Sequence, residues 1–124
     1  MLLVDDNEAA RVLVARYLGR SGFDGHIQHA ESIAEACASL EAGPFDVVVT
    51  DHFFRGKAEG LNLVRHIRAT RPTMPVVVFS SADQLCNAAM QAGATAFVST
   101  RHWDQIATCV RNLLHPRQNP ESPG

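Results

Sequence analysis

The segment Val47–Asp51, which reads Val-Val-Val-Thr-Asp, constrains the fold of this chain more than any other. Its dense valines, bounded by Pro44 and Gly56, predict a strand that is buried on both faces. The segment ends in a carboxylate, and open α/β sheets bind their ligands at the carboxyl ends of the strands. We therefore expect Asp51 to lie at a functional edge of a parallel sheet.

Apolar strand-like segments alternate with segments of helical periodicity along most of the chain. The predicted strands are residues 2–4, 26–30, 47–51, 76–79 and 95–99, and the predicted helices are residues 8–20, 32–42, 60–71, 83–91 and 102 or 103 to 114. Ser32 followed by Glu35 is a capping box that starts the second helix. This alternation predicts an α/β fold, a doubly wound parallel sheet of five strands with five helices on its two faces.

The overall composition narrows the class of protein. A length of 124 residues suits one domain, and a net charge of −2 with a pI near 6.3 gives no electrostatic footprint for nucleic acid. No apolar run approaches the ~18 residues of a membrane helix, and no signal peptide is visible. We therefore expect a cytoplasmic protein that makes no contact with a membrane.

The cysteines and the chain end add two further expectations. Three widely spaced cysteines favour reduced thiols over a disulfide framework or a zinc site. Residues 115–124 contain three prolines and no apolar residue, which is typical of a disordered tail or the start of a linker. The folded domain should therefore span residues 1–114.

Acidic and hydroxyl side chains stand at the ends of three predicted strands. Asp5 and Asp6 follow the first strand, Asp51 ends the third, and Ser80 follows the fourth. In a parallel sheet these strand ends share one edge, so the four side chains should meet there. Three carboxylates repel each other and favour a hard cation with oxygen ligands, for which Mg²⁺ is suited. A metal beside a carboxylate nucleophile and a hydroxyl is an arrangement for phosphoryl transfer.

Each of these residues also has a structural interpretation. Asp5 and Asp6 can cap the following helix, and Asp51 can be a turn residue. Their matching positions at several strand ends favour the site over this alternative. His52 should point away from the Asp51 side chain, because neighbours on a strand alternate, and we expect it to pack at the surface.

Five motifs, in order and at nearly the expected spacing, resemble the receiver domain of two-component response regulators of the chemotaxis-regulator type. The segments are Leu3–Asn7 for the acidic pair, Val48–Asp51 for the phosphoacceptor strand, Glu59-Gly60 for the acidic-glycine pair, Pro75–Ser81 for the strand with the switch hydroxyl, and Gly93–Val98 for the Gly-Ala turn and switch aromatic. The resemblance covers residues 1 to about 114. It implies a flavodoxin-like (β/α)5 fold with strand order 2-1-3-4-5, and a signalling module rather than an enzyme.

The resemblance also implies a role for each site residue. Asp51 would accept a phosphoryl group from the phosphohistidine of a sensor histidine kinase or a phosphotransfer protein. Asp5, Asp6, Asp51 and the backbone carbonyl of Phe53 would hold Mg²⁺. Ser80 would bind a phosphoryl oxygen and move toward it.

A switch from this site to a partner surface is implied as well. When Ser80 moves, Phe97 would turn into the vacated space. That rotation would change the face formed by the helix at 83–91, the strand at 95–99 and the helix ending at 114. The changed face would bind a downstream protein target, an output domain of the same protein, or a second copy in a homodimer.

One position departs from the family pattern at the site itself. The family places a lysine seven residues after the glycine of the Gly-Ala turn, usually followed by a cis proline. Here Thr100 stands at that position and Arg101 follows it. Arg101 begins one residue later, where strand alternation would send its side chain to the other face. Without a proline at 101, the Thr100–Arg101 peptide should be trans.

Two loop lengths depart as well. The loop between Asp51 and Gly60 is one residue longer than the family pattern. The segment between Ser80 and Gly93 is about two residues short, so the fourth helix should be abbreviated or shifted.

Two other classes of function stay open. Because of Thr100, the chain can be a pseudo-receiver that serves as a phosphorylation-independent interaction module. An enzyme of related topology is disfavoured by motif: an aspartyl-phosphate phosphatase would need an Asp-x-Asp motif where Asp5 and Asp6 are adjacent, and a flavodoxin would need a Ser/Thr/Gly-rich phosphate loop there.

Overall fold

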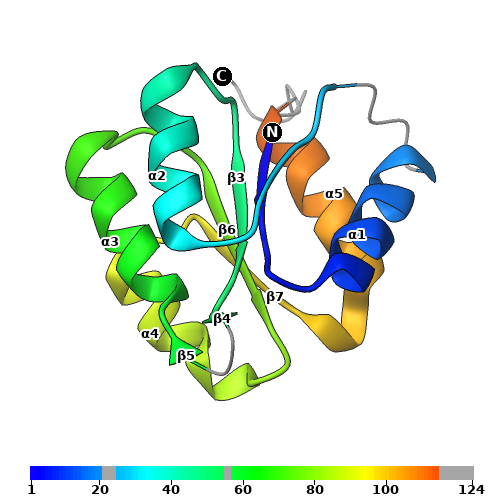
Figure 1. The fold of residues 1–124 in the computed structure, drawn as a ribbon. Helices are drawn as coiled ribbons and strands as arrows, with labels where there is room; N and C mark the ends of the chain where they lie inside the picture. The colour runs from blue at the N-terminus through cyan, green and yellow to red at the C-terminus, as the bar shows by residue number, and fades with distance from the viewer. Residues whose placement is uncertain (21–24, 55–56, 115–124) are drawn as a thin grey trace, which may run out of the picture.

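A parallel five-stranded sheet forms the centre of the molecule (Figure 1). The computed structural model describes residues 1–20, 25–54 and 57–114, so the tail expected at 115–124 lies outside the described residues. The strands of the sheet are β1 Leu2–Val4, β2 Gln28–Ala30, β3 Val48–Asp51, β6 Val76–Ser80 and β7 Ala96–Ser99. Their spatial order, β2-β1-β3-β6-β7, confirms the predicted order 2-1-3-4-5.

Helices cover both faces of this sheet. They are α1 Glu8–Arg20, α2 Ile33–Ala42, α3 Gly60–Thr70, α4 Cys86–Ala92 and α5 Trp103–Leu114. Figure 1 shows α2, α3 and α4 on one side of the sheet, and α1 and α5 on the other. Side chains alternate accordingly along β1: Leu2 and Val4 pack in one core cluster with Leu40, whereas Leu3 packs in the other with Val14. The doubly wound α/β class is confirmed.

The valine-rich strands β3 and β6 lie in the middle of the sheet, and their apolar side chains are buried. They pair in parallel register, with Val48 beside Val76 and Asp51 beside Phe79. The predicted capping box also forms, because the backbone N–H of Glu35 donates to Ser32 Oγ at 3.1 Å at the start of α2.

The connection from β6 to β7 contains a short helix, as expected from its length. A 3-10 turn, η1, spans Asp83–Leu85 and leads into α4, which has seven residues. Gly93 ends α4 with a φ of 114°, a conformation that favours glycine. Its carbonyl accepts from Arg68 Nε at 2.9 Å and from Arg68 Nη2 at 2.7 Å. The C-terminal end of α3 is thereby tied to the turn before β7.

A small antiparallel hairpin follows β3, which the sequence had not predicted. It consists of β4 Phe53–Phe54 and β5 Lys57–Ala58. The carbonyl of His52 accepts from the backbone N–H groups of Glu59 at 3.1 Å and Gly60 at 2.7 Å. These bonds close the base of the excursion, so the extra residue of this loop is absorbed in a hairpin and α3 still begins next to β3.

The cysteines are free thiols, as expected. Cys37 and Cys109 are half-buried and Cys86 is exposed. Burial raises the pKa of the Cys109 thiol. Burial is also the largest cause of the raised pKa of the Cys37 thiol. Both thiols therefore stay protonated at neutral pH. None of the helices in the described ranges combines the length and apolarity needed to cross a membrane.

Candidate functional site

Three carboxylates meet at the carboxyl edge of the sheet. Strands β1 and β3 pair with Val4 beside Thr50, so the residues that follow, Asp5 and Asp51, leave the sheet at the same level. Carboxylate oxygens of Asp5, Asp6 and Asp51 all lie within 4.8 Å of one another. Asp5 is buried, and the other two are half-buried. Clustered oxygen ligands of this kind suit a hard divalent cation such as Mg²⁺, as predicted.

Burial changes the protonation of the Asp5 carboxyl. It raises the pKa of this group from the usual 3.8 to about 6, and the neighbouring Asp6 carboxylate adds to the rise. The backbone N–H of Asn7, which donates to Asp5 Oδ1 at 2.9 Å, and the guanidinium of Arg11 act in the opposite direction. Asp5 therefore holds a proton more readily than an exposed aspartate does.

A cation from α1 stands beside the cluster, and sequence reasoning missed it. Arg11 Nη1 donates to the backbone carbonyl of Asp5 at 2.7 Å, and Nη2 pairs with Glu31 Oε1 at 3.1 Å. The Arg11 side chain is only 12% exposed, so these contacts hold it in place. The signal available in the sequence was an arginine one turn into the helix that follows the acidic pair. In the structure this side chain points inward.

The Asp51 side chain is oriented by the backbone of the residue that follows it. Its Oδ1 accepts from the N–H of His52 at 2.7 Å, and the Thr50 hydroxyl donates to the Asp51 carbonyl at 2.9 Å. The expectation that His52 packs at the surface is wrong, since the residue is only 4% exposed and burial lowers its pKa. The reason is the closed loop, which returns Glu59 and Gly60 onto the His52 carbonyl and covers this position.

Ser80 ends the neighbouring strand on the other side of Asp51. Because Asp51 pairs with Phe79, Ser80 lies one residue further along β6, at the same edge. It is buried, and its Oγ accepts from the N–H of Ala82 at 3.1 Å. A hydroxyl held in this way can rotate to donate to an anion at the edge.

Phe97 and Thr100 lie on or after β7. Phe97 pairs with Val78 and is half-buried against the core cluster beneath α2, α3 and α4. Thr100 is half-buried and begins a 3-10 turn, η2, which spans Thr100–His102. The described residues contain no cis peptide, which confirms the trans Thr100–Arg101 bond. Arg101 leaves this turn and pairs with Asp83 Oδ2 at 3.4 Å.

The remaining predicted ligand is the backbone carbonyl of Phe53. Phe53 begins β4, two residues beyond Asp51, and pairs with Ala58 in the hairpin. The hairpin pairing fixes the Phe53 backbone two residues after Asp51 in the chain. That the Phe53 carbonyl binds the metal stays a prediction.

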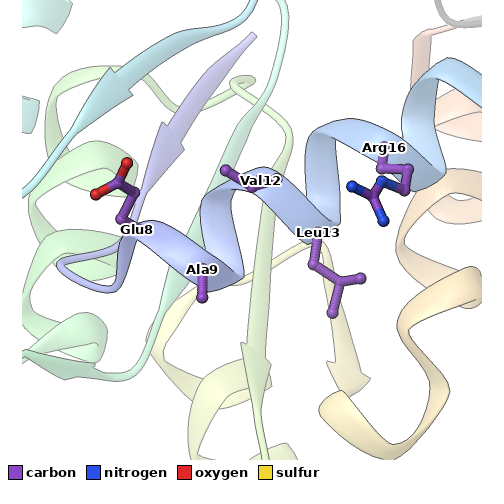
Figure 2. A pocket seen from close by; sticks show the side chains of 5 residues that line it. All are labelled: Glu8, Ala9, Val12, Leu13 and Arg16. Atoms are coloured by element: carbon purple, nitrogen blue, oxygen red, sulfur yellow. The ribbon is translucent and has the colours of Figure 1, made fainter.

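A second feature of the same edge is an open pocket along α1 (Figure 2). It is lined by Glu8, Ala9, Val12, Leu13 and Arg16. Val12 is 52% exposed, and the charged Glu8 and Arg16 flank it.

Comparison with known proteins gives the family of this doubly wound sheet with carboxylates clustered at its carboxyl edge. The profile of the response regulator receiver domain matches residues 1–107. The chain therefore belongs to the receiver domain family of two-component signalling, as the sequence motifs predicted.

Relatives with known roles are longer than this chain. The transcriptional regulatory protein AruR of Pseudomonas aeruginosa is 30% identical over 103 residues, which cover 79% of this chain and 41% of AruR. The response regulator MprA of a Mycobacterium species is 27% identical over 129 residues, which cover 99% of this chain and 55% of MprA. The chain thus spans about half the length of these relatives.

Solved structures of receivers superpose closely. The receiver domain of NtrX from Brucella abortus gives a TM-score of 0.81 at 25% identity, covering 94% of this chain and 98% of that one. The response regulator TrrA from Thermotoga maritima, solved in complex with Mg²⁺-BeF, gives 0.79 at 25% identity, covering 91% and 96%.

Proposed function

We propose that this receiver accepts a phosphoryl group on Asp51 and holds Mg²⁺ beside it. The observation that carries the proposal is the cluster of Asp5, Asp6 and Asp51, whose oxygens lie within 4.8 Å of one another. These carboxylates, with the carbonyl of Phe53, would be the metal's protein ligands. The Mg²⁺-BeF complex of the similar protein TrrA supports a site of this type.

The donor is the phosphohistidine of a sensor histidine kinase or a phosphotransfer protein. An Asp51 carboxylate oxygen attacks phosphorus, an O–P bond forms, and the N–P bond to the donor imidazole breaks. The leaving imidazole keeps the electron pair of that bond and takes up a proton. Asp5 and Asp6 would hold Mg²⁺, which would supply positive charge for the phosphoryl oxygens. The Ser80 hydroxyl donates to a phosphoryl oxygen.

The signal then leaves through the face formed by α4, β7 and α5. Movement of Ser80 toward the phosphoryl group opens space into which Phe97 turns, and this changes the surface of that face. Phe97 is half-buried on β7, one of the elements of this face. The face would bind a downstream target, an output domain of a longer protein, or a second receiver. The length of the relatives supports an output domain.

The phosphodonor has to approach over the edge that carries Asp51. Helix α1 starts two residues after Asp6, and its pocket presents the exposed Val12 between Glu8 and Arg16. We propose that the donor protein contacts this part of α1. Such a partner works in the cytoplasm, where free thiols such as those of this chain persist.

The alternative, a phosphorylation-independent interaction module, draws its support from Thr100 alone. The clustered carboxylates count against it, because three acids placed together destabilise a fold that does not use them.

Phosphorylation of the purified chain by acetyl phosphate with Mg²⁺ tests the proposal. Wild type should gain one phosphoryl group by intact mass, and both Asp51→Asn and removal of Mg²⁺ should abolish the gain. Asp46→Asn is the matched control, since Asp46 is an exposed aspartate just before the same strand at the opposite edge. Labelling that persists in Asp51→Asn, or is absent from wild type, contradicts the proposal.

A further inference from the structure

An exposed ion pair joins two turns at the carboxyl edge. Ser80 pairs with Ser99 across β6 and β7, so both strands reach this edge side by side. The turn η1 begins at Asp83, shortly after β6, and the turn η2 follows β7 directly. Arg101 Nη1 of η2 lies 3.4 Å from Asp83 Oδ2 of η1. The guanidinium of Arg101 therefore reaches from the end of β7 to the turn that follows β6.

This pair is weak enough to exchange partners. The Arg101 side chain is 71% exposed and that of Asp83 is 49% exposed, so water screens their attraction. The backbone of the turn is nevertheless fixed, because the N–H of Arg101 donates to Ser99 Oγ at 3.2 Å. The result is an exposed cationic head on a positioned backbone.

Because of the 3-10 turn η2, the expectation that the Arg101 side chain lies on the other face of the strand does not hold. Strand alternation would send residue 101 to the face opposite residue 100, but β7 ends at Ser99 and the chain turns there with about three residues per turn. The Arg101 side chain points along the edge toward η1, as its contact with Asp83 shows.

A phosphoryl group on Asp51 would add negative charge to this edge, which already carries the Asp5 and Asp6 carboxylates. An exposed guanidinium at the same edge is a suitable partner for that added charge.

We propose that Arg101 is the cation that pairs with the phosphoryl group on Asp51, and that Asp83 holds it in reserve until that group arrives. The inference rests on the proposed function and names the group that replaces the family's lysine. Strand β7 lies two strands from β3, about 10 Å across the sheet. An extended Arg101 side chain and a phosphorylated Asp51 side chain together span that distance, one from each side. The planar fork of Arg101 would hold two phosphoryl oxygens at once.

Beryllofluoride binding in the presence of Mg²⁺ tests this assignment, with the fluorescence of Trp103, the single tryptophan, or calorimetry as the readout. Arg101→Gln should weaken binding about fivefold, and Arg101→Lys should retain most of it. Asp83→Asn should strengthen binding about twofold, because the competing partner is gone, and should have no such effect in the Arg101→Gln background.

Two controls separate a phosphoryl partner from a general charge effect. Arg111→Gln removes an equally exposed arginine from the far end of α5 and should leave binding unchanged. Thermal stability and Mg²⁺ affinity without beryllofluoride should be the same in Arg101→Gln and wild type, since a purely structural role would alter the first.

The outcomes distinguish the two proposals. Wild type that binds no beryllofluoride overturns both the phosphoacceptor and the Arg101 assignment. Wild type that binds, with Arg101→Gln binding equally well, overturns the Arg101 assignment alone. The same holds if Lys57→Met, which removes the single lysine of the sequence from the β4–β5 hairpin, weakens binding and Arg101→Gln does not.

Discussion

The carboxyl edge of the sheet has an acidic half over β1 and β3 and a cationic half over β6 and β7, and the two differ in how they keep the family pattern. In the acidic half every predicted carboxylate is present and clustered. In the cationic half Ser80 is kept, but Thr100 replaces the lysine and an exposed Arg101–Asp83 pair joins the turns. Short acidic side chains work only from fixed strand ends, whereas a long cationic side chain can reach the same point from a neighbouring position.

The largest expected effect lies under the acidic half, at Gly60. A Cβ at this position would overlap the Asp51 carbonyl oxygen and stand 2.5 Å from His52 Cα. Gly60→Ala should therefore lower the free energy of unfolding by more than about 3 kcal/mol, measured by urea denaturation. Gly19→Ala is the control, because nothing lies within 4 Å of its new methyl group and alanine favours the helix. Equal stability of Gly60→Ala and wild type would show that the backbone of β3 is not fixed by this close approach.

The next effect is the loss of stability that the charge of Asp5 causes when no metal is bound. Since folding raises the pKa of Asp5 from 3.8 to about 6, the folded state binds more protons than the unfolded state between these values. In EDTA the contribution of Asp5 to stability should therefore be greatest below pH 4, fall as the pH rises to about 6, and stay low above it.

Removing the charge of Asp5 should remove that slope. Asp5→Asn keeps an oxygen for the Asn7 N–H, and it should raise the free energy of unfolding at pH 7 by up to about 3 kcal/mol. Denaturation curves at several pH values measure both effects, and Asp46→Asn is the exposed control. A slope between pH 4 and 6 that survives in Asp5→Asn would assign it to another group.

The smallest effect tests the cationic half. Thr100→Lys should restore an ammonium at the family position and strengthen beryllofluoride binding about fivefold in the Arg101→Gln background. The gain should be smaller in wild type, where Arg101 already supplies the charge. Thr70→Lys adds the same charge at the end of α3 and should leave binding unchanged. Equal gains in both backgrounds would show that Arg101 does not share the role.

Most of the architecture could be predicted from the sequence, because local periodicity and strand composition act over a few residues. The valines of β3 and β6 marked the central strands, and the Ser32–Glu35 pair marked the start of α2. Since parallel strands share one edge, the clustering of Asp5, Asp6 and Asp51 followed from their positions at strand ends.

Contacts between segments that are far apart in the sequence determined the features that could not be predicted. The burial of His52 depends on the return of Glu59 and Gly60, and the role of Arg11 depends on where α1 lies against β1. Neither leaves a periodic signal, because each arises from groups that meet only after the sheet has formed.

The sequence by itself thus determined the family, the strand order and the acidic half of the site, since these depend on which residues stand at the strand ends. Only the tertiary structure decided where the Arg101 side chain lies. The 3-10 turn after β7 directs Arg101 along the edge to Asp83, and such a change of direction depends on the packing of the two turns rather than on the pattern of the strand.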